Sequence, residues 1–298
     1  MAGKAVVMIR LAPSEQAPHA VDNRQKIYIR VDSHSHPSLY RLADLEELDW
    51  LFEQRRKGDQ FLSTIVEESR ARAVRVLEHM AGEDIPVLTV MIQPRFFRGN
   101  LSFSPIELRN LLTGERCMAR SKHISRPFPE TAREGRSIPG GYCLHTSIHR
   151  QTTGTQSEYV EINQSGVILS QAKYRIKHGS NRFVTVAELL LQVDGFLRLA
   201  ERVFSGKASG PLRLHAELAR AQGVSLALTR DSIGRELEEL VETKQSYDSS
   251  ITVLDTTVDE VLAGEARLDA VKQAAEAILW AFGYDWSGRP FEEWWEGR

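Results

Sequence analysis

The sequence is poor in the features that mark several large protein classes. Its 298 residues include two cysteines, Cys117 and Cys143, too few for a disulfide scaffold or a cysteine zinc site. No apolar run reaches the roughly 18 residues that cross a bilayer. Arg10, Glu15 and His19 interrupt the first apolar stretch, so it does not resemble a signal peptide. We therefore expect a soluble, cytoplasmic protein that does not contact a membrane.

Familiar catalytic motifs are missing as well. The chain contains no GxSxG, Walker A or GxGxxG sequence, each of which would place a nucleophile or a phosphate at a strand-to-helix turn. The Gly140-Gly141 pair is explained by a turn before a strand. Acidic pairs such as Glu67-Glu68 lie in polar stretches, where a solvated face is the default. We therefore assign no catalytic residue, no cofactor and no metal, and leave open whether the protein is an enzyme.

Charge is unevenly distributed along the chain. The net charge is −2, but residues 93–150 carry ten Lys/Arg against four Asp/Glu, and residues 231–298 carry six against sixteen. A basic stretch attracts phosphate groups, because cationic side chains release counterions from nucleic acid. The simpler alternative is a solvated loop that faces an acidic surface of the same molecule.

Hydrophobic periodicity predicts an α+β fold in which an antiparallel sheet is covered by helices. Strands cluster and helices follow them, which is not the alternating order of βαβ units. Ser104, Pro105 and Glu107 form a helix start of the capping-box type. Residues 115–140 are rich in Arg, Ser, Pro and Gly and predict a long loop. The strands at 142–149, 159–163 and 167–174 are predicted to form an antiparallel meander. The full set of predicted strands is 6–11, 26–31, 86–94, 142–149, 159–163, 167–174, 211–218, 224–228 and 250–254. The predicted helices end near residues 56, 82, 113, 204 and 282.

The helix prediction includes a break near Gly58 and Asp59, because glycine interrupts the apolar pattern there. A longer helix then follows to Gly82, and it carries Arg70, Arg72 and Arg75. These arginines could contact phosphates, but arginine on an exposed helical face is usually surface. We expect a first unit at 1–57, a connecting helix at 58–82 and an α+β domain at 83–298.

Histidine and cysteine offer two weaker candidates for chemistry. His145 and His149 lie four apart on a predicted strand, which separates their Cα atoms by about 13 Å. One metal ion is not normally held by two side chains so far apart. Cys143 and His145 share a strand face, but no third group orients them. A buried structural cysteine is the commoner situation.

Three of the five tryptophans lie in the acidic segment 284–295. Aromatic side chains stack on bases, but the carboxylates beside them repel phosphate. We expect this segment to pack on the body of the protein, with a protein interface as the second interpretation.

The first sixty residues resemble the C-terminal half of the AlbA_2 domain of Schlafen-type proteins. The resemblance depends on Pro13-Ser14, on Pro18-His19 and on the strand end Tyr28-Ile29-Arg30-Val31. The chain has Asp32 where the family has glycine, and the acidic opening segment of the family is absent before Ala5. The resemblance therefore implies a relative of the family without support for its nuclease activity.

This resemblance implies a nucleic-acid-binding accessory or regulatory protein. Backbone and hydroxyl donors in a turn after a strand hold phosphate, and arginine adds charge. The implied nucleic-acid contacts are Arg30, Ser33, His34, Ser35, His36, Arg55, Arg56 and Lys57. Two alternatives remain: an ATP-binding or other nucleotide-binding regulatory module, and an assembly subunit. In the last case a second copy or a partner protein would complete the small N-terminal unit, which cannot bury a core alone.

Overall fold

The computed structural model describes residues 20–21, 26–30, 40–78, 85–95, 101, 103–114, 117–121, 125–129, 134–150, 154–174, 176–178, 181–205, 211–227, 245–258, 264–284 and 295. The chain divides into two compact units. The first holds residues 1–63 and 96–98, and the second holds residues 64–95 and 99–298. The predicted strand at 6–11 lies outside the described residues.

The first unit contains a small antiparallel sheet and the beginning of a long helix. The sheet has the order β1-β2-β3, from β1 (Ala20–Val21), β2 (Lys26–Arg30) and β3 (Tyr40–Leu42). Helix α1 (Leu45–Glu78) follows. The helix begins with a reciprocal cap formed by Asp44 and Glu47. The Asp44 side chain accepts a hydrogen bond from the backbone N–H of Glu47 at 2.9 Å, and the Glu47 side chain accepts one from the backbone N–H of Asp44 at 3.0 Å.

The predicted break at Gly58 and Asp59 is wrong, because α1 is one continuous helix of 34 residues. A glycine inside a helix costs only about 1 kcal/mol relative to alanine. The helical turns on both sides of Gly58 stabilise the helix by more than that cost, so the helix continues through Gly58.

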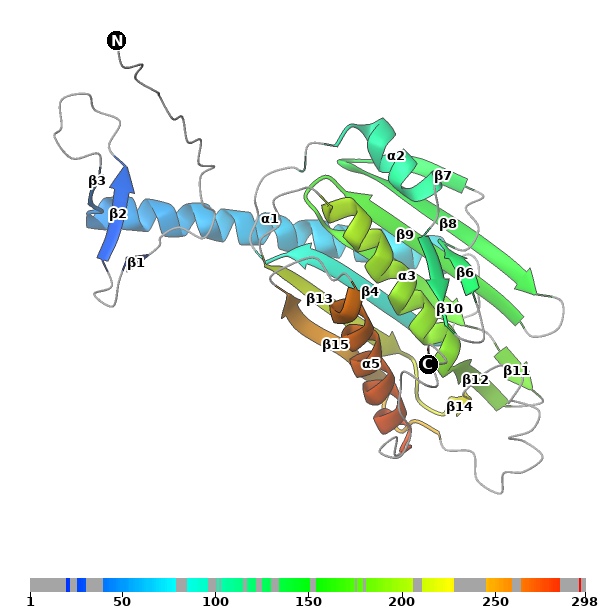
Figure 1. Cartoon of the computed structure of the whole chain (residues 1–298). Coiled ribbons are helices and arrows are strands. Elements are labelled where there is room, and N and C mark those ends of the chain that lie inside the picture. Colours follow the sequence, from blue (N-terminus) through cyan, green and yellow to red (C-terminus); the bar gives the residue numbers. More distant parts are fainter. Residues whose placement is uncertain are drawn as a thin grey trace, which may run out of the picture. The chain divides into compact units, whose positions relative to one another are not determined.

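The second unit is built on a seven-stranded sheet of order β15-β13-β4-β10-β9-β8-β7 (Figure 1). Every neighbouring pair in it is antiparallel. The α+β class predicted from the sequence is therefore confirmed. In chain order the strands are β4 (Val87–Pro94), β7 (Glu134–Ile138), β8 (Gly141–Arg150), β9 (Gly154–Asn163), β10 (Ile168–Tyr174), β13 (Leu212–Ala219) and β15 (Ser250–Val258).

Two smaller sheets and three more helices complete the described part of this unit. The hairpin β5 (Cys117–Arg120) and β6 (Ser125–Phe128) packs near α3, and β11 (Ile176–His178), β12 (Asn181–Thr185) and β14 (Ser225–Ala227) form a three-stranded sheet. The helices are α2 (Pro105–Thr113), α3 (Val186–Phe204) and α5 (Gly264–Ala281). The capping box predicted at Ser104 and Glu107 is present.

Two predictions for this unit are wrong. Residues 115–140 are not one loop, because β5, β6 and β7 lie within them. The two strands expected at 211–218 and 224–228 do not pair with each other: β13 joins β4 and β15, and β14 joins β12 in parallel. The short strands β5, β6 and β7 carry too little apolar periodicity to be recognised in the sequence, and local periodicity does not determine which distant strands pair.

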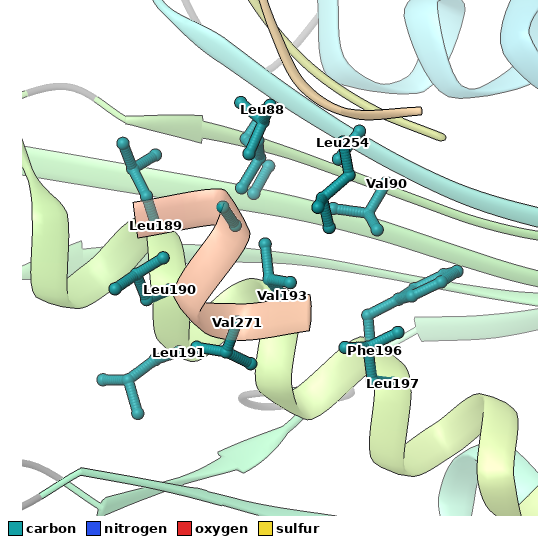
Figure 2. Close-up of a cluster of buried hydrophobic side chains, with 14 of the residues drawn as sticks. Leu88, Val90, Leu189, Leu190, Leu191, Val193, Phe196, Leu197, Leu254 and Val271 are labelled. Carbon is teal, nitrogen blue, oxygen red and sulfur yellow. The ribbon is translucent and has the colours of Figure 1, made fainter. Parts of the chain in front are cut away.

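The main core lies between one face of the sheet and helices α3 and α5. Leu88, Val90 and Ile92 of β4 face this core, whereas Met91 belongs to a second cluster on the opposite face. Figure 2 shows apolar side chains of α3 and α5 gathered with Leu88 and Val90. Ala73 and Leu77 of α1 pack in the second cluster. Both faces of the sheet are therefore covered by helices.

Candidate functional site

The residues proposed from the family resemblance lie in the first unit. Ser33, His34, Ser35 and His36 fall outside the described residues. Arg30 is the last residue of β2 and pairs with Tyr40 of β3. Arg55, Arg56 and Lys57 are exposed on α1, and Arg56 forms an ion pair with Glu53 at 2.8 Å. The structure therefore brings the last three together on one turn of a helix.

A cleft in the second unit gathers three arginines that sequence reasoning did not combine. Arg72 and Arg75 of α1 line it together with Arg136 of β7, and its volume is about 460 Å³. Val76, Ile138 and Pro139 supply apolar walls, and Ser137 completes the lining. The cleft thus combines cationic groups with an apolar surface, an arrangement typical of sites for amphipathic anions.

The local structure explains why these side chains meet. Arg72, Arg75 and Val76 are three and four residues apart, so they share one side of the helix. Arg136 and Ile138 are two apart on β7, so they share one face of the sheet. Arg136 pairs with Cys143 of β8, whose side chain belongs to the cluster that α1 covers. The covered face of the sheet therefore directs Arg136 toward the helix.

Arg72 is held by a buried carboxylate beneath the cleft. Glu161 of β9 is 1% exposed, and its Oε1 and Oε2 accept from Nη2 and Nε of Arg72 at 2.7 and 3.1 Å. This two-bond geometry is the strong form of an arginine–carboxylate pair. The hydrogen bond to Glu161 raises the pKa of Arg72 further above its usual value. Arg72 therefore stays charged and is fixed in position.

Two further donors complete the hydrogen bonds of Glu161. Ser69 Oγ donates at 2.7 Å and Tyr159 OH donates at 2.6 Å. Burial, followed by the charge of Glu161, raises the pKa of Tyr159. Because the Arg72 charge is matched by Glu161, the positive charge available to a ligand comes from Arg75 and Arg136. Both side chains are exposed, and Arg75 Nε donates to the Ala71 carbonyl at 3.3 Å.

The expectation that Arg72 is ordinary helix surface was wrong, since its side chain is mostly buried and is paired with Glu161. No local signal could have shown this, because Glu161 lies 89 positions further along the chain. Arg136 was not recognised as a candidate, because it lies in a segment that was predicted to be a loop. The three arginines meet only through the tertiary fold.

A second polar cluster lies in the main core. Gln192 of α3 donates from Nε2 to Glu158 Oε1 at 2.6 Å and to Ser170 Oγ at 2.9 Å. Its Oε1 accepts from Arg126 Nη2 at 2.7 Å. Burial raises the pKa of the neighbouring Tyr174 hydroxyl. All of these side chains are buried, so we interpret the cluster as a polar connection between α3, β6 and the sheet.

The two cysteines are buried core residues. Cys143 is fully buried in the second cluster, and burial raises the pKa of the Cys117 thiol in the main core. His149 lies on β8, but its side chain is outside the described part. Within the described ranges no group of three His, Cys, Asp or Glu side chains is placed to hold a metal ion. The described helices include none that is long and apolar enough to cross a membrane.

The expected packing of the tryptophan-rich C-terminal segment is observed at Trp295. Its side chain is buried in the main core. The neighbouring residues 285–294 lie outside the described part.

Comparison of the chain with protein-family models, with curated proteins and with solved structures finds no match.

Proposed function

We propose that the protein binds single-stranded nucleic acid at the cleft of Arg72, Arg75 and Arg136. The observation that carries the proposal is the combination of these guanidinium groups with an apolar wall in one open cleft. Proteins that bind single strands use a cationic groove for the backbone and flat or apolar surfaces for the bases. The family resemblance of the first unit points to the same class of ligand.

The charges assign separate roles to the lining residues. Arg75 and Arg136 are the phosphate contacts, because both are exposed and neither is balanced by Glu161. Arg72 is a positioning residue that fixes one wall of the cleft. Val76, Ile138 and Pro139 take the base or the sugar face. A planar guanidinium also stacks on a base, which adds affinity without sequence readout.

The size of the cleft favours a single strand over a duplex. A volume of about 460 Å³ lies in the range of small-ligand sites and admits one nucleotide unit whose neighbours continue along the surface. Duplex readout instead needs a helix or ribbon that enters a groove about 12 Å wide. Arg55 and Lys57 are further exposed cations on the first unit, and we propose them as additional phosphate contacts.

The test is fluorescence anisotropy with a labelled single-stranded oligonucleotide at low and moderate salt. The Arg75→Ala/Arg136→Ala variant should lose at least about tenfold in affinity. Its slope of log K against log salt should be shallower by roughly 1.4, because each phosphate contact contributes about 0.7 for a single strand. Arg213→Ala is the matched control, since Arg213 is also exposed on a strand of the sheet and pairs with Asp255. Absent binding, or an equal loss in the control, rejects the proposal.

A free nucleotide is the second candidate, because the cleft has room for one nucleotide unit. In that case ATP should raise the Tm of the protein, whereas a short oligonucleotide without a terminal phosphate should not. Ligand binding to the folded state stabilises by RT ln(1 + [L]/Kd), so the shift must grow with ATP concentration. The same double arginine variant separates this site from non-specific binding.

A further inference from the structure

The first half of α1 exposes an unusual number of large apolar side chains. Leu45, Trp50, Phe52 and Phe61 have exposed fractions of 79%, 61%, 53% and 44%. Leu42, just before the helix, is also exposed. Single exposed apolar residues are normal, and an interaction surface is indicated where such residues lie together on one face. All of these residues belong to the first unit.

Four residues form one stripe on this helix segment. Leu45, Asp49, Phe52 and Arg56 follow at intervals of four, three and four residues, which is the spacing of one helical face. All four are exposed. Trp50 is two positions from Phe52, so it lies about 200° around the helix and on the other side. The stripe therefore has an aromatic centre with an acidic residue before it and a basic residue after it.

Charge along the segment is polarised in the same direction. Its first turns carry Asp44, Glu46, Glu47 and Asp49 and no Lys or Arg, and the following turns carry Arg55, Arg56 and Lys57 beside Glu53 and Asp59. Two copies in parallel would bring like charges together. Two copies in antiparallel orientation bring the acidic turns of each against the basic turns of the other. The segment is therefore complementary to itself about a two-fold axis.

We propose that the partner of this face is a second copy of the chain, bound through an antiparallel pair of α1 segments. The two-fold axis passes beside Phe52, which packs against Phe52 of the second copy. Asp49 then faces Arg56 of the second copy, and the same pair is repeated by symmetry. Arg56 already has Glu53 as a neighbour at 2.8 Å. That pair is exposed, so it is weak enough to be shared or exchanged.

The size of the surface sets the strength of the association. The helix from Leu45 to Ser63 is about 28 Å long at 1.5 Å per residue. A single helix pair of this length lies at the small end of specific interfaces, and such interfaces form reversible complexes. The dimer should therefore dissociate on dilution and should weaken as salt screens the charged pairs.

Sedimentation velocity of the full chain over a concentration series provides the first test. Wild-type protein should show a reversible monomer–dimer equilibrium. Phe52→Glu should weaken dimerisation at least tenfold. Trp50→Glu is the matched control, since it removes an exposed aromatic from the same turn but from the other side, and it should leave the dimer constant within about threefold. A wild-type monomer at every concentration overturns the proposal, as does equal weakening by both variants.

A charge exchange provides the second test and fixes the orientation. Asp49→Arg and Arg56→Asp should each weaken dimerisation, because each places like charges face to face. The double variant Asp49→Arg/Arg56→Asp restores both symmetric pairs with their signs reversed, and its dimer constant should return to within about threefold of wild type. Failure of the double variant to recover rejects the antiparallel register. Circular dichroism checks that every variant keeps its helix.

Discussion

Arg72 and Glu161 join two parts of the chain that lie 89 positions apart. Nη2 of the arginine lies 2.7 Å from Oε1 of the carboxylate, and the side chains are 12% and 1% exposed. The pair attaches the second half of α1 to β9 of the sheet. It also fixes one wall of the arginine cleft, so the stability of this face and the geometry of the cleft depend on the same contact.

Replacement of Arg72 should therefore lower the free energy of unfolding far more than replacement of its neighbour Arg75. Arg72→Met leaves the buried Glu161 charge without its cation, and such losses cost about 3–5 kcal/mol. Arg75→Met removes an exposed side chain and should change the unfolding free energy by less than about 0.5 kcal/mol. Urea denaturation of both variants measures the difference. Equal effects would contradict a structural role for the Arg72–Glu161 pair.

Tyr159 predicts a loss of stability at alkaline pH. Burial raises the pKa of this hydroxyl in the folded protein, whereas its pKa in the unfolded chain is about 10. At a pH between these two pKa values, the folded protein keeps a proton that the unfolded chain releases. Its contribution is fully present below about pH 10 and falls by about 1.4 kcal/mol per pH unit above it. Tyr159→Phe removes this contribution together with the hydrogen bond to Glu161.

The measurement compares urea unfolding of wild type and Tyr159→Phe at pH 9, 10 and 11. Below pH 10 the variant should be less stable by about 1.5–3 kcal/mol, the usual value of a hydrogen bond to a charged group. This difference should narrow as the pH rises. Tyr247→Phe is the control, because Tyr247 is almost fully exposed. A difference that stays constant for Tyr159→Phe would show that the buried hydroxyl titrates normally.

The polar cluster of the main core should be sensitive to loss of Gln192. Gln192→Met keeps the size of the side chain but takes one partner each from Glu158, Ser170 and Arg126. Removal of one member of such a network costs about 2–4 kcal/mol, since buried polar groups lose hydrogen bonds that water cannot replace. Gln273→Met on the exposed side of α5 should be close to neutral. Similar urea midpoints for the two variants would reject the assigned role of Gln192.

Replacement of Gly195 by alanine should destabilise the protein, although a glycine-to-alanine change inside a helix usually stabilises it. The rule predicts a gain of about 1 kcal/mol for Gly195→Ala. Here an added Cβ would lie 2.5 Å from Cβ and 2.7 Å from Cγ of Phe128, so α3 and β6 would have to move apart. We expect a net loss of about 1–3 kcal/mol, as for other overpacked cores. A raised melting temperature, with unchanged helix content by circular dichroism, would show that the contact has room to relax.

The parts of the fold that the sequence predicts well are those with strong local signals. The meander of β8, β9 and β10 is indicated in the sequence by apolar strand segments and by a glycine turn. That glycine, Gly166, has a φ of 85°. Helix α3 has apolar residues around most of its surface and Thr185 at its N-cap. In each case the periodicity and the boundary residue indicate the same element.

The arginine cleft could not be predicted, because it depends on contacts between distant segments. Arg72 and Arg136 are both unremarkable polar residues in their local sequence. Their meeting depends on the sheet order that places β7 and β8 on the side covered by α1. The predicted pairing of 211–218 with 224–228 failed for a related reason. β13 pairs along its whole length with β4 and β15, whereas β14 has only three residues to offer.

The position of β4 in the sheet also has a consequence for biosynthesis. Val90 pairs with Ser170 on one side and with Ala216 on the other, so both neighbours of this apolar strand leave the ribosome long after it does. Pairing of segments so distant in sequence makes folding slow. Until translation has passed β13, the nascent chain exposes an aggregation-prone segment with two open edges. Production of the full chain should therefore depend on chaperones that bind β4 until β13 has been translated, and it should improve at low temperature, where hydrophobic association is weaker.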